Sequence, residues 1–166
     1  YSTVFKKGYS KFIENSVMSG LDGLTIPDLP VEENQEIFEI ARRNDFKVVC
    51  FIAPTTTDQR VSLITQKAQG FLYYISVVGI TGIRDKLPDD IIQNINKLKQ
   101  MTNIPVAVGF GVSTSEHAKL IGTVADGVIV GSAIMREIEK YAKEPSEELV
   151  RGVGEFVGQL ISGAKG

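Results

Sequence analysis

Five short apolar runs, each rich in β-branched residues and separated from the next by an amphipathic segment, constrain the fold of this chain more than any other feature. The runs cover residues 21–26, 47–53, 71–78, 105–110 and 126–133. Continuous apolar runs of this length are typical of strands that are buried on both faces of a sheet. The sequence therefore predicts five buried strands.

The segments between these runs carry apolar residues at helical spacing, for example in residues 91–98. Helix start signals agree, because Thr57 precedes one segment and Ser113 stands in capping-box spacing with Glu116 before another. Strands that alternate with helices pair in parallel through right-handed crossovers. We predict an α/β fold, a parallel (β/α)8 TIM barrel with about five βα units present, and a single domain over residues 1–166.

Charge and composition exclude several classes of partner. With 18 basic and 20 acidic residues the net charge is -2, so we expect no nucleic-acid partner. No run reaches the roughly 18 apolar residues of a membrane span. The lone cysteine, Cys50, allows no internal disulfide, and the lone histidine, His117, has no neighbouring His or Cys that would favour zinc. We expect a cytoplasmic protein without a metal site.

Glycine-rich stretches follow three neighbouring predicted strands. They are GITG (79–82), GFGVS (109–113) and VGSAI (130–134). In a parallel sheet the ligand lies beyond the carboxyl ends of the strands, where glycine lets backbone amides approach an oxyanion and a helix N-terminus adds positive charge. Ser132 would add a hydroxyl donor. These loops predict a site for a phosphate monoester that is bound mainly by backbone amides.

Four motifs give the chain a family resemblance: IPDLPVEE (26–33), YYISVVGITG (73–82), VGFGVS (108–113) and GVIVGSAI (127–134). In this order and spacing they resemble the tryptophan synthase alpha subunit. The resemblance implies a (β/α)8 barrel lyase without a cofactor of its own, which cleaves indole-3-glycerol phosphate to indole and glyceraldehyde 3-phosphate. It also implies a heterotetramer in which the indole passes to a pyridoxal-phosphate-bearing beta subunit.

The resemblance implies roles for eight residues, with the five strands corresponding to strands four to eight of the barrel. It places Tyr73 near the catalytic centre as an auxiliary residue, Gly82, Gly111, Gly131 and Ser132 at the substrate phosphate, Pro27 and Ile52 in the indole pocket, and Asp28 at the interface with the beta subunit. Each role has a structural alternative. Tyr73, Pro27 and Ile52 could be core residues, and Asp28 could stabilise a helix N-terminus.

One departure from the family concerns the acid and base groups. The family uses a Glu and an Asp near a P-F-S-D-P-type motif on the early strands, and neither this motif nor strands one to three have a counterpart here. Either the sequence omits part of a longer chain, which we expect, or the chain is a partial barrel. Two other functions stay open: a related phosphate-sugar barrel enzyme such as indoleglycerol-phosphate synthase, or a non-catalytic partner of a second subunit.

Overall fold

The described residues form one parallel sheet with helices on its outer side. The computed structural model describes residues 1–33, 35–75, 90–109 and 111–165. Five strands lie in the order of the sequence: β1 (Gly23–Thr25), β2 (Lys47–Ile52), β3 (Leu72–Ile75), β4 (Val106–Gly109) and β5 (Gly127–Val128). Every neighbouring pair is parallel. This confirms the predicted parallel α/β fold.

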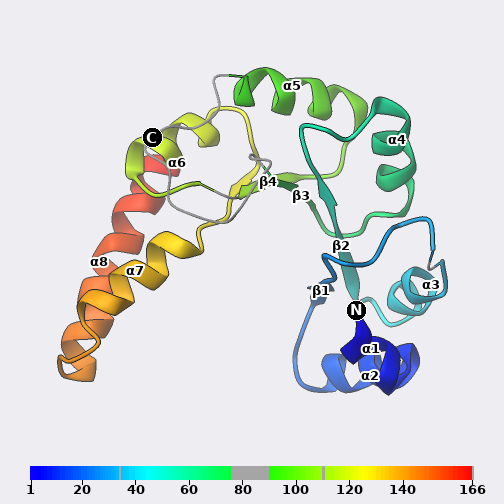
Figure 1. Cartoon of the computed structure of the whole chain (residues 1–166), viewed down its shortest axis with the longest axis horizontal. Coiled ribbons are helices and arrows are strands. Elements are labelled where there is room, and N and C mark those ends of the chain that lie inside the picture. Colours follow the sequence, from blue (N-terminus) through cyan, green and yellow to red (C-terminus); the bar gives the residue numbers. More distant parts are fainter. Residues whose placement is uncertain (34, 76–89, 110, 166) are drawn as a thin grey trace.

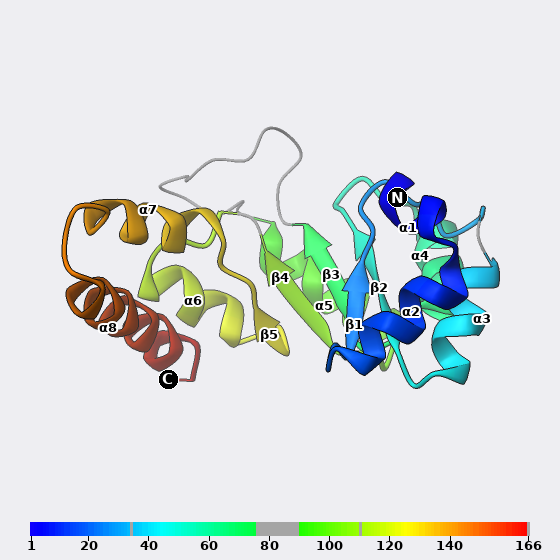
Figure 2. The same ribbon diagram turned by 90° about the horizontal axis from the view of Figure 1, so that it is seen from below.

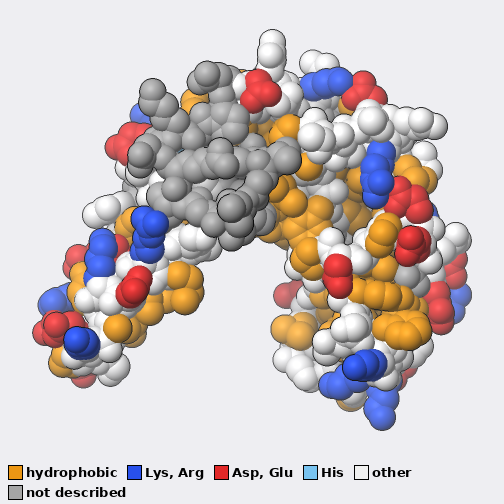
Figure 3. All heavy atoms as spheres, in the orientation of Figure 1, with side chains coloured by type: hydrophobic (Ala, Val, Ile, Leu, Met, Phe, Trp, Pro, Cys, Tyr) orange, Lys and Arg blue, Asp and Glu red, His pale blue; other side chains and the backbone are white. Residues whose placement is uncertain are grey.

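Eight helices accompany the strands within the described residues. They are α1 (Ser2–Lys7), α2 (Tyr9–Met18), α3 (Gln35–Arg43), α4 (Asp58–Lys67), α5 (Ile91–Met101), α6 (Ser115–Gly122), α7 (Ser132–Lys140) and α8 (Ser146–Lys165). The molecule is an arc, with α3, α4, α5 and α6 on its convex side and the pairs α1–α2 and α7–α8 at its two ends (Figures 1 and 2). Among the described residues the concave side is hollowed, and hydrophobic side chains gather along part of it (Figure 3).

The core lies between the sheet and the convex helices, because alternate strand residues face opposite sides. Helix-facing strand residues are buried with helical residues in one hydrophobic cluster; they are Val48, Cys50, Ile52, Leu72, Tyr74, Val106 and Val108. Phe51, Tyr73 and Ala107, which alternate with them on β2, β3 and β4, are only half-buried. Full burial of one large aliphatic side chain contributes about 1.5–3 kcal/mol, so the convex side holds the fold together.

Two predicted element boundaries needed correction. Thr114, not Ser113, caps α6, because the Thr114 hydroxyl accepts a hydrogen bond from the His117 amide at 3.2 Å. The apolar run 126–133 forms a strand over two residues only, since α7 begins at Ser132 within it. The α4 cap is confirmed: Thr57 accepts from the Arg60 amide at 3.4 Å. Of the helices described, none has the length and apolar character to cross a bilayer.

Candidate functional site

Two glycine turns leave the sheet side by side at its carboxyl edge. Val108 of β4 pairs with Val128 of β5, and the Ile129 amide donates to the Val108 carbonyl at 2.8 Å. Gly111 lies three residues after Val108, and Gly131 lies three residues after Val128. The sheet register therefore delivers both glycines to the same edge, as the sequence predicted for the strand ends. Gly82 lies outside the described residues.

Gly111 has a backbone conformation that favours glycine. Its φ is +89°, a left-handed region in which a side chain is strained. The residue is half-exposed and leads into Val112, which is buried in the core. Burial of Val112 thus anchors the chain directly after Gly111.

Gly131 and Ser132 form an uncapped helix start. Gly131 occupies the N-cap position of α7, where no side chain of the described residues caps the helix, and the first turn holds no acidic residue. A Cβ placed on Gly131 would meet no described residue within 4 Å, and both Gly131 and Ser132 are exposed. By contrast, α4 and α6 have threonine caps and an acidic first turn. As far as the described residues go, the first amides of α7 and the positive end of its dipole are therefore available to an anion.

Tyr73 lies on the concave face of β3, next to the aromatic ring of Phe51. The two ring centroids are 5.0 Å apart and the planes are inclined by 34°. The register places Phe51 opposite Tyr73 and Tyr73 opposite Ala107, so a small side chain stands on the other side of the tyrosine. Partial burial raises the pKa of the Tyr73 hydroxyl, so the group stays protonated at neutral pH.

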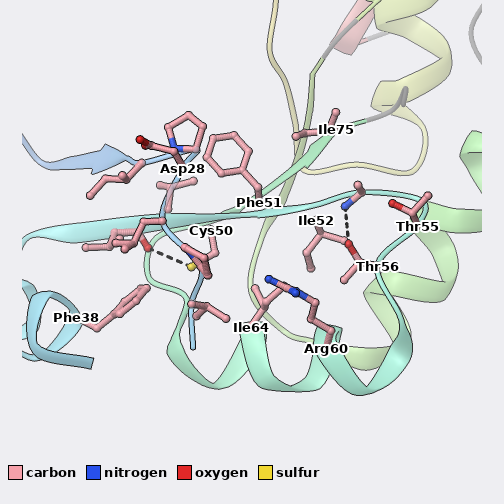
Figure 4. A pocket seen from close by; sticks show the side chains of 18 residues that line it. Asp28, Phe38, Cys50, Phe51, Ile52, Thr55, Thr56, Arg60, Ile64 and Ile75 are labelled. Atoms are coloured by element: carbon pink, nitrogen blue, oxygen red, sulfur yellow. Dashed lines mark hydrogen bonds between the residues drawn. The ribbon is translucent and has the colours of Figure 1, made fainter. Parts of the chain in front are cut away.

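A cavity of about 450 Å³ surrounds the mouths of β1 and β2 (Figure 4). Pro27, Asp28, Phe51, Ile52 and Ile75 are among its lining residues. Figure 4 shows Phe51 and Ile75 on one side of β2, and Ile52 on the opposite side, toward Thr56 and α4. Pro27 is exposed, whereas Ile52 is 3% exposed and belongs to the core cluster. The structure therefore brings Pro27 and Ile52 to the lining of one cavity, although the Ile52 side chain is buried toward α4.

Asp28 stands at the exposed edge of this cavity. Its carboxylate accepts two hydrogen bonds from the α-ammonium group of Tyr1, the first residue of the given sequence, at 2.7 and 2.9 Å. The side chain remains 66% exposed, so it stays accessible to a partner.

Three residues of the concave face were missed by sequence reasoning: Phe51, Ile75 and Gly109. Strict strand alternation would have found the first two, because each lies two residues from another concave-face position, Val49 or Tyr73. Gly109 carries no such signal, since its role depends on which side chain the neighbouring strand places against it. Metal binding has no support in the described ranges, where no group of three or more His, Cys, Asp or Glu side chains could hold an ion.

Comparison with known proteins decides the family. The family model described as "Tryptophan synthase alpha chain" matches residues 1–164. This chain belongs to that family. The tryptophan synthase alpha chain of a Thermoanaerobacter species is 42% identical over 161 residues, which are 96% of this chain and 60% of the relative. That of Methanocaldococcus jannaschii is 39% identical over 144 residues, 87% of this chain and 51% of the relative.

Solved structures agree with the family and with the barrel fold. The tryptophan synthase a2b2 complex of Pyrococcus furiosus matches with a TM-score of 0.82 and 37% identity over 95% of this chain and 64% of the other. A tryptophan synthase alpha chain from Legionella pneumophila matches with a TM-score of 0.84 and 27% identity over 99% of this chain and 60% of the other. The sheet is thus five βα units of a TIM barrel, and the chain spans about 60% of its curated relatives.

Proposed function

We propose that this chain, a member of the tryptophan synthase alpha chain family, cleaves indole-3-glycerol phosphate to indole and glyceraldehyde 3-phosphate, and that the residues of its candidate site bind the phosphoryl end of the substrate. The observation that carries the proposal is the open start of α7 beside the Gly111 turn. The family membership supports the identity of the substrate. A related synthase of the same barrel type is not favoured, because the alpha-chain model matches residues 1–164.

The phosphate site would act through backbone amides. The first-turn amides of α7, the Ser132 hydroxyl and the backbone at Gly111 would offer donors at one edge of the sheet, and Gly82, which lies outside the described residues, would join them. A phosphate monoester carries charge that the helix dipole and these donors stabilise without a basic side chain. Binding energy at this end holds the reacting carbon in place while the indole ring is cleaved away.

Cleavage itself needs acid and base groups. The bond between indole C3 and the glycerol carbon breaks, C3 gains a proton, and the hydroxyl on the glycerol carbon loses one as the aldehyde forms. The resemblance assigns these transfers to a Glu and an Asp for which this sequence offers no matching motif. Tyr73, protonated and fixed between Phe51 and Gly109, would orient the substrate or one of these carboxylates.

The proposal includes a partner and a compartment. Exposed Asp28, with Pro27 beside it at the cavity mouth, would contact a tryptophan synthase beta subunit, and the similarity to the Pyrococcus furiosus a2b2 complex supports this assembly. Pro27 would line the indole end of the substrate site, whereas Ile52, whose side chain is buried toward α4, would support β2 from its other side. Cys50 is a buried free thiol, which fits a reducing compartment such as the cytoplasm.

A pair of variants at Gly131 tests the proposal. Gly131→Asp places a carboxylate where the phosphate would bind, and should raise KM for indole-3-glycerol phosphate by tenfold or more, in line with about 1.4 kcal/mol per factor of ten. The same variant should keep or raise thermal stability, because aspartate is a good N-cap. Gly131→Ala has open space and serves as the control. An unchanged KM in Gly131→Asp would contradict the phosphate site.

A non-catalytic role, in which the chain docks to and activates a second subunit, is the second candidate, because the residues given include no counterpart of the family's carboxylate motif. It predicts binding to a beta subunit without indole release. Measuring indole release and beta-subunit binding on the same sample separates the two functions. Indole release by the protein without added enzyme excludes the non-catalytic role.

A further inference from the structure

A second, smaller cavity lies on the opposite side of the sheet from Tyr73. It has a volume of about 70 Å³ and opens between β3, the loop before α4 and α5. Its polar lining residues are Thr56, Asp58, Tyr74, Asn94 and Lys97. Of these residues only Thr56 also lines the larger cavity, so the smaller cavity needs a separate explanation.

Tyr74 lines this cavity and carries a buried hydroxyl group. The side chain is 2% exposed, and within the described part of the chain its hydroxyl oxygen is buried without a hydrogen-bond partner. Burial, together with the nearby Asp90 carboxylate, raises the pKa of Tyr74 to about 12, and the Asn94 amide opposes this rise in part. The Asn94 group is therefore close, although it does not meet the geometry of a hydrogen bond. A protonated phenol in this position is a donor that needs an acceptor.

Some hydrogen-bonding atoms of the neighbouring side chains are already paired, and others remain available as donors or acceptors. Asn94 Nδ2 donates to Asp90 Oδ2 at 2.9 Å, which leaves the Asn94 carbonyl oxygen as an acceptor. Thr56 Oγ1 accepts from the Ala53 amide at 3.0 Å, which leaves the Thr56 hydroxyl proton as a donor. Lys97 Nζ is paired with Asp58 at 2.6 and 2.8 Å. The cavity thus offers one strong donor, one acceptor and one further donor around a small polar space.

We propose that this cavity is a hydration site in which ordered water accepts a hydrogen bond from Tyr74 and donates one to Asn94. About 70 Å³ holds one or two waters, each of which occupies roughly 30 Å³ in the liquid, and a water needs two to four polar partners to be held. An unsatisfied buried hydroxyl is costly, whereas a bridging water is nearly as favourable as a direct hydrogen bond. The site fixes α5 to β3, the strand whose other face carries Tyr73.

Tyr74→Phe in the full-length protein tests this proposal, because it keeps the ring and removes only the hydroxyl. Loss of the bridge should lower the Tm by about 2–4 °C, the shift expected for one hydrogen bond in a protein of this size. Tyr141→Phe, which removes a hydroxyl at the end of α7, is the control and should leave the Tm unchanged. If Tyr74→Phe leaves the Tm unchanged or raises it, the hydroxyl is simply unsatisfied and the proposal is wrong.

Two further measurements identify the water itself. Proton NMR should show a slowly exchanging Tyr74 hydroxyl with a cross-peak to a long-lived water, and Tyr74→Phe should lose this signal. In an Asn94→Ala background the Tyr74→Phe substitution should have a much smaller effect on the Tm, since the bridge is already broken. Absence of the water cross-peak, or fully additive Tm changes, would overturn the hydration site.

Discussion

The ring of Tyr73 lies directly against Gly109 of the neighbouring strand. A Cβ placed on Gly109 would be 2.4 Å from the Tyr73 hydroxyl oxygen and 2.6 Å from Cε1 of the ring. Contacts this short are not compatible with the observed ring position, so the absence of a side chain at 109 lets Tyr73 lie flat on the sheet. The position of the tyrosine hydroxyl at the concave face therefore depends on a glycine in another strand.

Substitution of Gly109 should displace Tyr73. We expect Gly109→Ala to destabilise the protein by about 1–3 kcal/mol, the usual cost of forcing an extra methyl group into a packed site. Because the hydroxyl also moves, kcat for indole-3-glycerol phosphate cleavage should fall. Urea unfolding and steady-state kinetics measure the two effects.

Gly154→Ala is the matched control for this substitution. Gly154 lies in α8, and a Cβ there would meet nothing within 4 Å. Alanine in a helix interior is favoured over glycine by about 0.5–1 kcal/mol, so this variant should be at least as stable as the wild type. If Gly109→Ala and Gly154→Ala are equally stable, the ring of Tyr73 does not prevent a side chain at position 109, and this account of the contact is wrong.

The turn at Gly111 gives a second prediction. Its φ of +89° should make Gly111→Ala cost about 1–2 kcal/mol in unfolding free energy, through backbone strain rather than through a clash. If the turn relaxes to relieve the strain, affinity for a phosphate monoester should also fall. Chemical denaturation with and without glycerol 3-phosphate checks both effects, and a variant as stable as the wild type contradicts the strained turn.

The sequence predicted the sheet and its glycine turns because both depend on local patterns. Five apolar runs set the strands, and the position of glycine after β4 and β5 is visible without any tertiary information. The contact of Tyr73 with Gly109 and Phe51 was not predictable, because it depends on the register between three strands. The single-residue shift of the α6 cap from Ser113 to Thr114 shows the same limit, since both residues are good caps and only packing decides between them.

Cys50 makes the stability sensitive to alkaline pH. Burial raises the pKa of its thiol to about 11, against an unfolded value near 9.0, and the nearby Lys67 opposes this rise in part. Because the unfolded chain loses the proton first, the unfolding free energy should fall as pH rises from 9 toward 11. Urea unfolding at pH 8 and pH 10.5 measures this change. The unfolding free energy should fall less in Cys50→Ala than in the wild type, and an equal fall in both proteins would contradict a raised pKa for the Cys50 thiol.

Asp126 makes the stability sensitive to acid. Its carboxylate accepts from Lys99 Nζ at 2.7 Å and from the Val106 amide at 2.8 Å, and these bonds lower its pKa below 3.8. The stabilisation is complete above pH 3.8 and is lost as pH falls through the lower folded pKa. Asp126→Asn should therefore lower stability at pH 7 and flatten its decline in acid. Thermal scans between pH 7 and pH 2.5 measure both effects. If the Tm of Asp126→Asn follows the same pH profile as that of the wild type, the two bonds contribute nothing to stability.

A titration of the isotope-labelled protein with glycerol 3-phosphate, followed by amide NMR, tests the central claim most directly. The account predicts that the amides of Gly111, Gly131 and Ser132 shift together with one saturating dissociation constant, while glycerol alone leaves them unmoved. Saturable binding that shifts amides elsewhere and leaves these three unchanged would contradict a phosphate site at the start of α7.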